Sequence, residues 1–188
     1  KVNMYCYGKK EPWFLQKVPS GKLPAIELNN QIITESDDII YFLEKEYGSL
    51  GTPIFSDELK KIRLLEREIF RYWCEWLCRD SFIFLDKAVR KKNLMVTLNK
   101  FEEILIKSKS GLIDPSLNSN SEIKPGTGDI IFIPYLERLN ASLCYYKGFN
   151  LRKEFPEIDK WFALLETYSS YLGTQGDFHT HSHDLPPQ

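Results

Sequence analysis

The hydrophobic pattern changes along this chain, and that change limits the possible folds more than any other feature. Over the first 50 residues, short alternating segments are separated by Gly, Pro and Asn, as strands and brief helices require. From residue 56 onward, apolar residues recur every three or four positions, which is typical of amphipathic helices. The sequence therefore predicts an α/β part followed by an all-helical part.

Within the first part, the order strand, helix, strand, strand, helix is predicted for five segments: Lys1–Tyr7, Trp13–Lys17, Ala25–Leu28, Gln31–Thr34 and Asp37–Tyr47. Asn29 and Asn30 favour a tight hairpin turn between the last two strands. Ser36 suits the N-cap of the second helix, and Gly48 suits its C-terminal end.

The second part contains four amphipathic stretches that predict a helical bundle: Asp57–Arg79, Met95–Lys107, Asp129–Lys147 and Pro156–Tyr171. Asp129 opens a very apolar stretch and is expected to have a structural role at its start. Residues 108–128 are rich in Ser, Asn, Gly and Pro and predict a long loop. Residues 174–188 show no helical period and are expected to lie extended over the surface.

Charge, hydropathy and cysteine content argue against several functions. The 25 Lys and Arg residues nearly balance the 26 Asp and Glu residues, so no general affinity for nucleic acid or anionic membranes is expected. No apolar run approaches the roughly 20 residues that span a bilayer. The four cysteines show no CxxC motif and predict reduced thiols in the cytoplasm, a plastid or a mitochondrion: Cys6, Cys74, Cys78 and Cys144.

Three short motifs occur in a recognisable order: Lys-Glu-Pro-Trp-Phe at 10–14, Pro-Ser-Gly-Lys-Leu-Pro at 19–24, and Glu-Ser at 35–36. With the apolar stretch at 129–138 and the tail from residue 173, they resemble the glutathione transferase superfamily, most closely its omega-like class of plants and algae. The resemblance implies the glutathione transferase fold, with glutathione as co-substrate. It divides the chain into a thioredoxin-like α/β domain over residues 1–50 and an all-α domain over residues 56–188.

The resemblance assigns glutathione-binding roles to five residues: Lys10, Leu23, Pro24, Glu35 and Ser36. A cis peptide bond before Pro24 would present the Leu23 backbone to the ligand's cysteinyl residue. Glu35 and Ser36, at a helix N-terminus, match the ammonium and carboxylate of the γ-glutamyl end. Lys10 would pair with the carboxylate at the other end. Structural interpretations stay open as well: Pro24 can be an ordinary turn proline and Ser36 only a helix cap. Glu35 and Lys10 can be solvated surface charges.

The first long helix carries aromatic residues with two interpretations. Tyr72, Trp73 and Trp76 are candidates for the hydrophobic wall of a second-substrate pocket. That substrate would be a small hydrophobic electrophile or a glutathionylated molecule. Aromatic residues at helical spacing also pack in bundle cores. Lys17 and Lys22 are expected to face solvent.

The resemblance implies one further strand and helix, roughly 25–30 residues, ahead of residue 1. In the family, the residue that activates or attacks the thiol begins that helix, so no catalytic residue is assigned within this sequence. Cys6 is expected to be structural. A Cys at the family position would indicate thiol transfer or deglutathionylation, and a Ser or Tyr would indicate conjugation.

Other interpretations stay open at this level. A transferase-like chain can be a non-catalytic interaction or scaffold module in a larger assembly, or a carrier of a flat apolar ligand such as a tetrapyrrole. A homodimer is compatible with each. His179, His181 and His183 alternate in the tail like a metal-binding tract, but a tail that docks back through hydrogen bonds is preferred, and no metal site is predicted.

Overall fold

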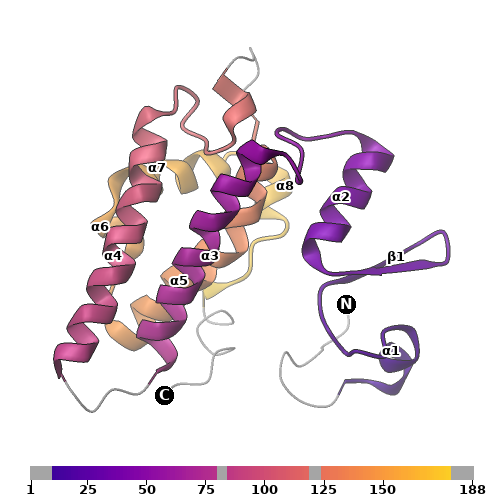
Figure 1. The fold of residues 1–188 in the computed structure, drawn as a ribbon, viewed down its shortest axis with the longest axis horizontal. Coiled ribbons are helices and arrows are strands. Elements are labelled where there is room, and N and C mark those ends of the chain that lie inside the picture. Colours follow the sequence, from indigo (N-terminus) through magenta and orange to yellow (C-terminus); the bar gives the residue numbers. More distant parts are fainter. Residues whose placement is uncertain (1–9, 80–83, 119–123, 179–188) are drawn as a thin grey trace.

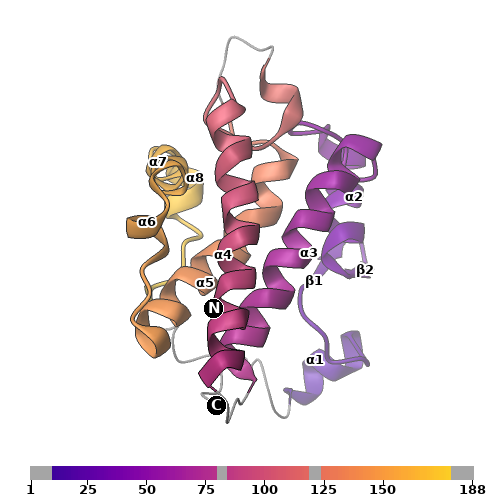
Figure 2. The same cartoon turned by 60° about the vertical axis from the view of Figure 1, so that its left-hand side comes forward.

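The computed structural model describes residues 10–79, 84–118 and 124–178, which form an α/β part beside a helical bundle (Figure 1, Figure 2). The α/β part contains α1 (Pro12–Lys17), β1 (Ala25–Leu28), β2 (Gln31–Thr34) and α2 (Ser36–Tyr47). The strand expected over Lys1–Tyr7 lies outside the described residues. In both views α3 of the bundle lies between this part and α4.

The two strands form an antiparallel hairpin in which Leu28 pairs with Gln31. Between them, Asn29 and Asn30 have φ angles of 50° and 62°. This left-handed region is the one that Asn tolerates best among residues with a Cβ atom, and a tight hairpin turn requires it. The predicted hairpin and its turn are therefore confirmed.

Helix α2 begins differently from the prediction. Its N-cap is Glu35, and Ser36 is already the first helical residue, so the expectation that Ser36 caps the helix is wrong. Glu35 has a φ angle of 67°, which is uncommon for a residue with a side chain and turns the chain from β2 into the helix. At the other end, Gly48 has a φ angle of 89° and ends the helix as predicted.

The described residues of the second part form six α-helices and one 3-10 helix: α3 (Asp57–Cys78), α4 (Phe84–Lys107), η1 (Pro115–Asn118), α5 (Thr127–Lys147), α6 (Leu151–Glu154), α7 (Pro156–Leu165) and α8 (Ser169–Leu172). Helix α4 begins well before the predicted Met95, because residues 86–93 are mostly charged and show no apolar stripe. The predicted fourth helix is divided into α7 and α8. Among the described helices, none is both long and apolar enough to cross a membrane.

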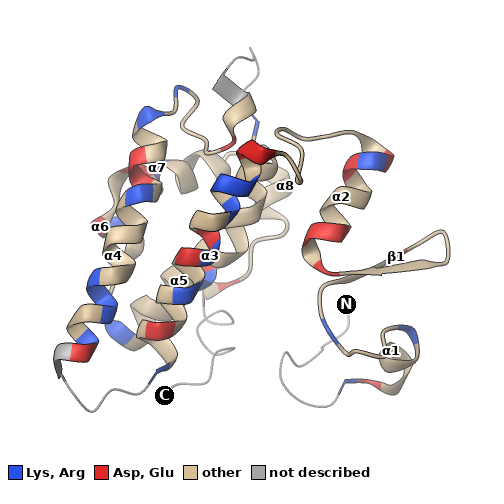
Figure 3. Cartoon of the chain, in the orientation of Figure 1, with Lys and Arg blue, Asp and Glu red and all other residues tan. Residues whose placement is uncertain are grey.

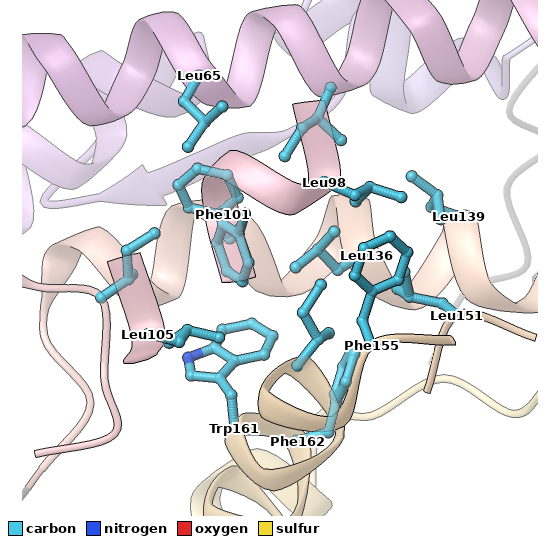
Figure 4. Packing of buried hydrophobic residues seen from close by; sticks show 14 of the residues in the cluster. Leu65, Leu98, Phe101, Leu105, Leu136, Leu139, Leu151, Phe155, Trp161 and Phe162 are labelled. Carbon is cyan, nitrogen blue, oxygen red and sulfur yellow. The ribbon is translucent and has the colours of Figure 1, made fainter. Parts of the chain in front are cut away.

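The core of the bundle lies between α3, α4, α5 and α7 (Figure 4). Phe101 of α4 is central to it, because its ring centroid lies 4.7 Å from that of Phe132 on α5 and 5.7 Å from that of Trp161 on α7. All three side chains are fully buried. Burial of each such side chain stabilises the fold by about 1.5–3 kcal/mol, so this cluster holds α4, α5 and α7 together.

Asp129 holds the start of α5 from within the core. Its carboxylate accepts hydrogen bonds from the N–H of Ile113 at 2.9 Å, the N–H of Gly126 at 3.1 Å and Nε1 of Trp161 at 2.8 Å. The expected structural role of Asp129 is therefore confirmed. The segment before α5, expected to be a long loop, is anchored to the core where it is described, since Leu112 and Ile113 are buried.

A second buried carboxylate, Asp114, joins the bundle to the linker between α2 and α3. It accepts hydrogen bonds from the N–H and hydroxyl of Thr52 at 3.1 and 2.8 Å, from the same two groups of Ser116 at 3.0 and 2.8 Å, and from the N–H of Gly128 at 2.8 Å. Gly51 is required beside it, because a Cβ atom there would lie 2.7 Å from a carboxylate oxygen. No structural role was predicted for Asp114 from the sequence.

Candidate functional site

The turn before β1 carries the first feature of the candidate site. The Leu23–Pro24 peptide bond is cis, as the resemblance implied. The Leu23 side chain is exposed, and none of the described residues forms a hydrogen bond with its backbone N–H or C=O. Lys10 lies beside this turn, because a Cβ atom on Gly21 would be 3.5 Å from Lys10 Cγ.

The N-terminus of α2 is the second feature. No side chain caps its first turn, so the N–H groups there are open to an anion. Ser36 is exposed at this end. Glu35 precedes it with an exposed carboxylate that forms an ion pair with Lys22, at 3.5 Å between Nζ and Oε1. Figure 3 shows acidic residues at this end of α2.

The hairpin brings these two features together. Ala25 pairs with Thr34 across the strands, so Pro24 and Glu35 lie at the same end of the hairpin. The Lys22–Glu35 ion pair spans the same gap. The five residues that the resemblance singled out therefore belong to neighbouring segments. Lys17 is also paired, with Glu27 of β1, and both side chains are about half exposed.

The helical bundle contributes a charged cluster next to α2. Arg63 of α3 donates to Asp37 in the first turn of α2 and to Glu66 Oε2 at 3.0 Å. Glu66 is buried, and its Oε1 has no hydrogen-bond partner among the described residues. Burial raises the pKa of Glu66, while the charges of Arg63 and Arg67 oppose that shift. Tyr135 of α5 lies near the cluster: burial and the Glu66 charge raise the pKa of Tyr135.

The predicted aromatic wall needs correction. Trp73 is 2% exposed and donates from Nε1 to Ser142 Oγ at 3.0 Å, so it lies in the core and lines no pocket. Its role as a wall residue was wrong because helical spacing alone does not tell a core face from a cleft face. Trp76 is partly buried against Phe149, with ring centroids 5.5 Å apart, and Tyr72 is partly buried under the Arg71 guanidinium.

A partly exposed aromatic pair that was not predicted from the sequence lies on α3 and α5. Phe70 of α3 is 39% exposed, and its ring centroid lies 5.5 Å from that of Tyr135. Phe70 follows Arg63 by two helical turns, and residues at this spacing share a helix face. Tyr135 lies near the start of α2: burial is the largest cause that raises the pKa of Tyr135, and the Asp37 charge is another. Periodicity alone does not set Phe70 apart from the buried Trp73 one helical turn later.

Cys74 and Cys78, two of the described cysteines, are not reactive thiolates. Burial raises the pKa of Cys74 to about 11 and also raises the pKa of Cys78, so both thiols stay protonated at neutral pH. Cys6 lies outside the described residues, as do His179, His181 and His183. Within the described ranges, no group of three or more His, Cys, Asp or Glu side chains is arranged to hold a metal ion.

Two apolar hollows lie elsewhere on the molecule. One of about 310 Å³ is lined by α2 and α5 residues such as Leu43 and Ile130. The other, of about 670 Å³, is lined by α5, α7 and α8 residues such as Ile133 and Leu165. None of the predicted site residues lines either hollow. The candidate site is therefore formed by the cis turn and the α2 N-terminus, apart from both hollows.

Known proteins resemble this chain in sequence and in structure. Residues 2–53 match the family model described as glutathione S-transferase, N-terminal domain. Glutathione S-transferase L3 of Arabidopsis thaliana is 26% identical over 171 residues, covering 90% of this chain and 68% of that protein.

Two solved structures share the fold. Dehydroascorbate reductase of Chlamydomonas reinhardtii has a TM-score of 0.70 at 18% identity, covering 92% of this chain and 75% of its own. Rice GST1, solved in complex with glutathione, has a TM-score of 0.65 at 16% identity, covering 92% of this chain and 78% of its own. The predicted glutathione S-transferase fold is thus confirmed. Residues 2–53 are thus similar in sequence to the N-terminal domain of glutathione S-transferases, and the chain shares the fold of the two solved structures.

Proposed function

We propose that this chain binds glutathione and uses it as the co-substrate of a transfer reaction. The observation that carries the proposal is the open backbone of Leu23 beside the uncapped N-terminus of α2. An extended backbone with free N–H and C=O groups recognises a peptide by strand-like pairing. A helix N-terminus recognises a carboxylate. A short peptide with an amino-acid head group satisfies both features at once.

Each end of the tripeptide has a complementary group. The cysteinyl residue pairs with the backbone of Leu23, and the γ-glutamyl carboxylate accepts hydrogen bonds from Ser36 and the first N–H groups of α2. Its ammonium group replaces Lys22 as the partner of Glu35, whose ion pair at 3.5 Å is exposed and therefore weak. Lys10, beside the same turn, pairs with the glycyl carboxylate.

The reaction class is either conjugation to a hydrophobic electrophile or thiol transfer with a glutathionylated substrate, as in the omega-like class. The protonated thiols of Cys74 and Cys78 do not support a nucleophilic role for either residue. No catalytic residue is therefore assigned among the described residues. The name of the Arabidopsis relative, glutathione S-transferase L3, favours a transferase over a non-catalytic interaction module.

The second substrate is expected to contact Phe70 and Tyr135, whose rings pack together and of which Tyr135 lies near the start of α2. Tyr72 and Trp76 remain candidates at the partly buried edge of α3. An aromatic pair of this kind binds apolar molecules through stacking and burial of area. Phe70→Ala is expected to raise the KM for the second substrate and to leave glutathione affinity unchanged.

The test of glutathione binding is isothermal titration of the full-length protein, with two site variants and a matched control. Ser36→Ala and Glu35→Gln each remove a hydrogen bond to a charged group, worth about 1.5–3 kcal/mol, so each should weaken binding about tenfold or more. Glu46→Gln, an exposed carboxylate at the far end of α2, should bind like wild type. No heat and no thermal stabilisation at millimolar glutathione would refute the proposed function.

A further inference from the structure

A guanidinium group from the helical bundle reaches the first turn of α2. Arg63 pairs with Asp37, which directly follows Ser36 in the chain. The Arg63 side chain is only 14% exposed, so solvent screens this ion pair weakly. The contact therefore links the two parts of the chain at the end of α2 where the proposed function places the ligand's carboxylate.

Asp37 by itself opposes the binding of an anion there. A negative side chain in the first turn of a helix repels a second negative charge at the same end. A short carboxylate can also accept hydrogen bonds from nearby backbone N–H groups and thereby occupy the site. With its carboxylate held by Arg63, Asp37 is neutralised and turned toward the bundle. The N–H groups of α2 are then available to a ligand.

Glu66 holds Arg63 from the other side. Its side chain is 1% exposed, and its Oε2 lies 3.0 Å from Arg63 Nη1 and 3.6 Å from Arg67 Nε. A carboxylate this deeply buried needs a fixed cation, since leaving it without one would be strongly destabilising. The Arg63 guanidinium is therefore fixed before any ligand arrives, and it presents its remaining N–H groups to Asp37.

We propose that Arg63 is a positioning residue for the glutathione site, because it neutralises Asp37 and keeps the N-terminus of α2 open to the γ-glutamyl carboxylate. This inference rests on the proposed function. It adds a residue of the helical bundle to a site otherwise built from residues 10–36. Binding at α2 then depends on how the α/β part is seated against α3.

The test is a double-mutant cycle on the full-length protein, with glutathione dissociation constants from calorimetry. Arg63→Gln leaves the Asp37 charge uncompensated and should weaken glutathione binding about tenfold. Asp37→Asn should bind within about threefold of wild type, and adding Arg63→Gln to it should cost little more. Arg63→Lys keeps the charge and should retain most of the affinity.

A ligand analogue separates positioning from general destabilisation. Wild type should prefer glutathione over an analogue that lacks the γ-glutamyl carboxylate, and Arg63→Gln should lose that preference. Arg90→Gln is the matched control. Its side chain is 18% exposed and pairs with Asp86 at 3.0 Å on α4, away from α2, so glutathione affinity should not change.

The proposal is overturned if Arg63→Gln binds glutathione like wild type. It is also overturned if Arg63→Gln weakens binding by the same factor in wild type and in the Asp37→Asn variant. If Arg63→Gln does not fold, Asp37→Asn is tested with the same analogue: it should keep the wild-type preference for glutathione, and loss of that preference would overturn the proposal. Weaker binding by Ser36→Ala with no effect of Arg63→Gln would refute this inference alone. Failure of wild type to bind glutathione would refute the proposed function as well.

Discussion

Replacing Asp114 with asparagine should strongly destabilise the protein, because this buried carboxylate accepts hydrogen bonds from three segments at once. One oxygen accepts from Thr52 and Ser116, and the other accepts from the N–H of Gly128 at 2.8 Å. Asparagine has the same shape but must present an NH₂ group on one side. If its oxygen stays with Thr52 and Ser116, the NH₂ group faces the Gly128 N–H, and two donors oppose each other.

Two effects set the size of this change. The lost hydrogen bond to a charged group is worth about 1.5–3 kcal/mol, and the buried donor left without a partner costs about 1–3 kcal/mol more. The free energy of unfolding should therefore fall by about 4 kcal/mol. In a protein of this size, that corresponds to a Tm lower by about 10 °C.

Urea and thermal unfolding of Asp114→Asn measure this change, with Asp57→Asn as the control. The Asp57 side chain is 88% exposed and pairs only with Lys60 at 2.8 Å among the described residues, so its loss should change the free energy of unfolding by less than about 1 kcal/mol. A Tm for Asp114→Asn within about 2 °C of wild type would refute the reasoning about opposed donors.

The pH dependence of the same variant gives an independent check. Burial alone would raise the pKa of Asp114, but the hydrogen bonds from Gly128, Ser116 and Thr52 outweigh it and hold that pKa below its usual value. A carboxyl group with a lowered folded-state pKa stabilises the protein above its unfolded-state pKa and loses that contribution as pH falls through the folded value. The stability gap between wild type and variant should therefore narrow below about pH 4. A gap that widens on acidification would contradict the assignment.

Two further carboxylates give predictions of smaller size. Glu102 on α4 accepts hydrogen bonds from the N–H groups of Glu157 and Ile158 at 2.9 and 3.2 Å. Glu102→Ala should therefore uncap α7 and lower the free energy of unfolding by about 1–2 kcal/mol. An unchanged midpoint of urea unfolding would contradict this. Burial raises the pKa of Glu66 above its ordinary value of 4.5. Wild type should therefore lose stability relative to Glu66→Gln as pH rises from about 4 to 7. A difference in unfolding free energy between the two proteins that stays constant over this range would argue against it.

Local features of this chain were predictable from the sequence, and the reason is that they depend on neighbouring residues only. The turn at Asn29 and Asn30 and the end of α2 at Gly48 follow from backbone preferences within two or three positions. The start of α2 failed by one residue, because Glu35 adopts a left-handed conformation that its residue type does not favour. That conformation is fixed by the path from β2 into α2, which the local sequence does not reveal.

Features that depend on distant contacts were missed or misassigned. Asp114 bonds to Thr52, 62 positions away, and nothing in the composition of its own segment marks it as buried. Trp73 and Phe70 lie one helical turn apart on α3, yet the first is 2% exposed in the core and the second is 39% exposed. Only the packing of α5 against α3 decides between these two positions, so periodicity predicted the helix without predicting its cleft face.

Acidic residues at the junction hold helix α2 against the bundle. Helix α2 is held near both ends: Asp37 pairs with Arg63, and Glu44 accepts hydrogen bonds from the Ile54 N–H and the Thr127 hydroxyl, each at 3.1 Å. With both ends held, α2 keeps one orientation relative to α3. Contacts at the junction and ligand binding at the α2 N-terminus are two coupled equilibria, and such coupling is reciprocal. If the junction strengthens ligand binding by a given free energy, the bound ligand must stabilise the junction by the same amount.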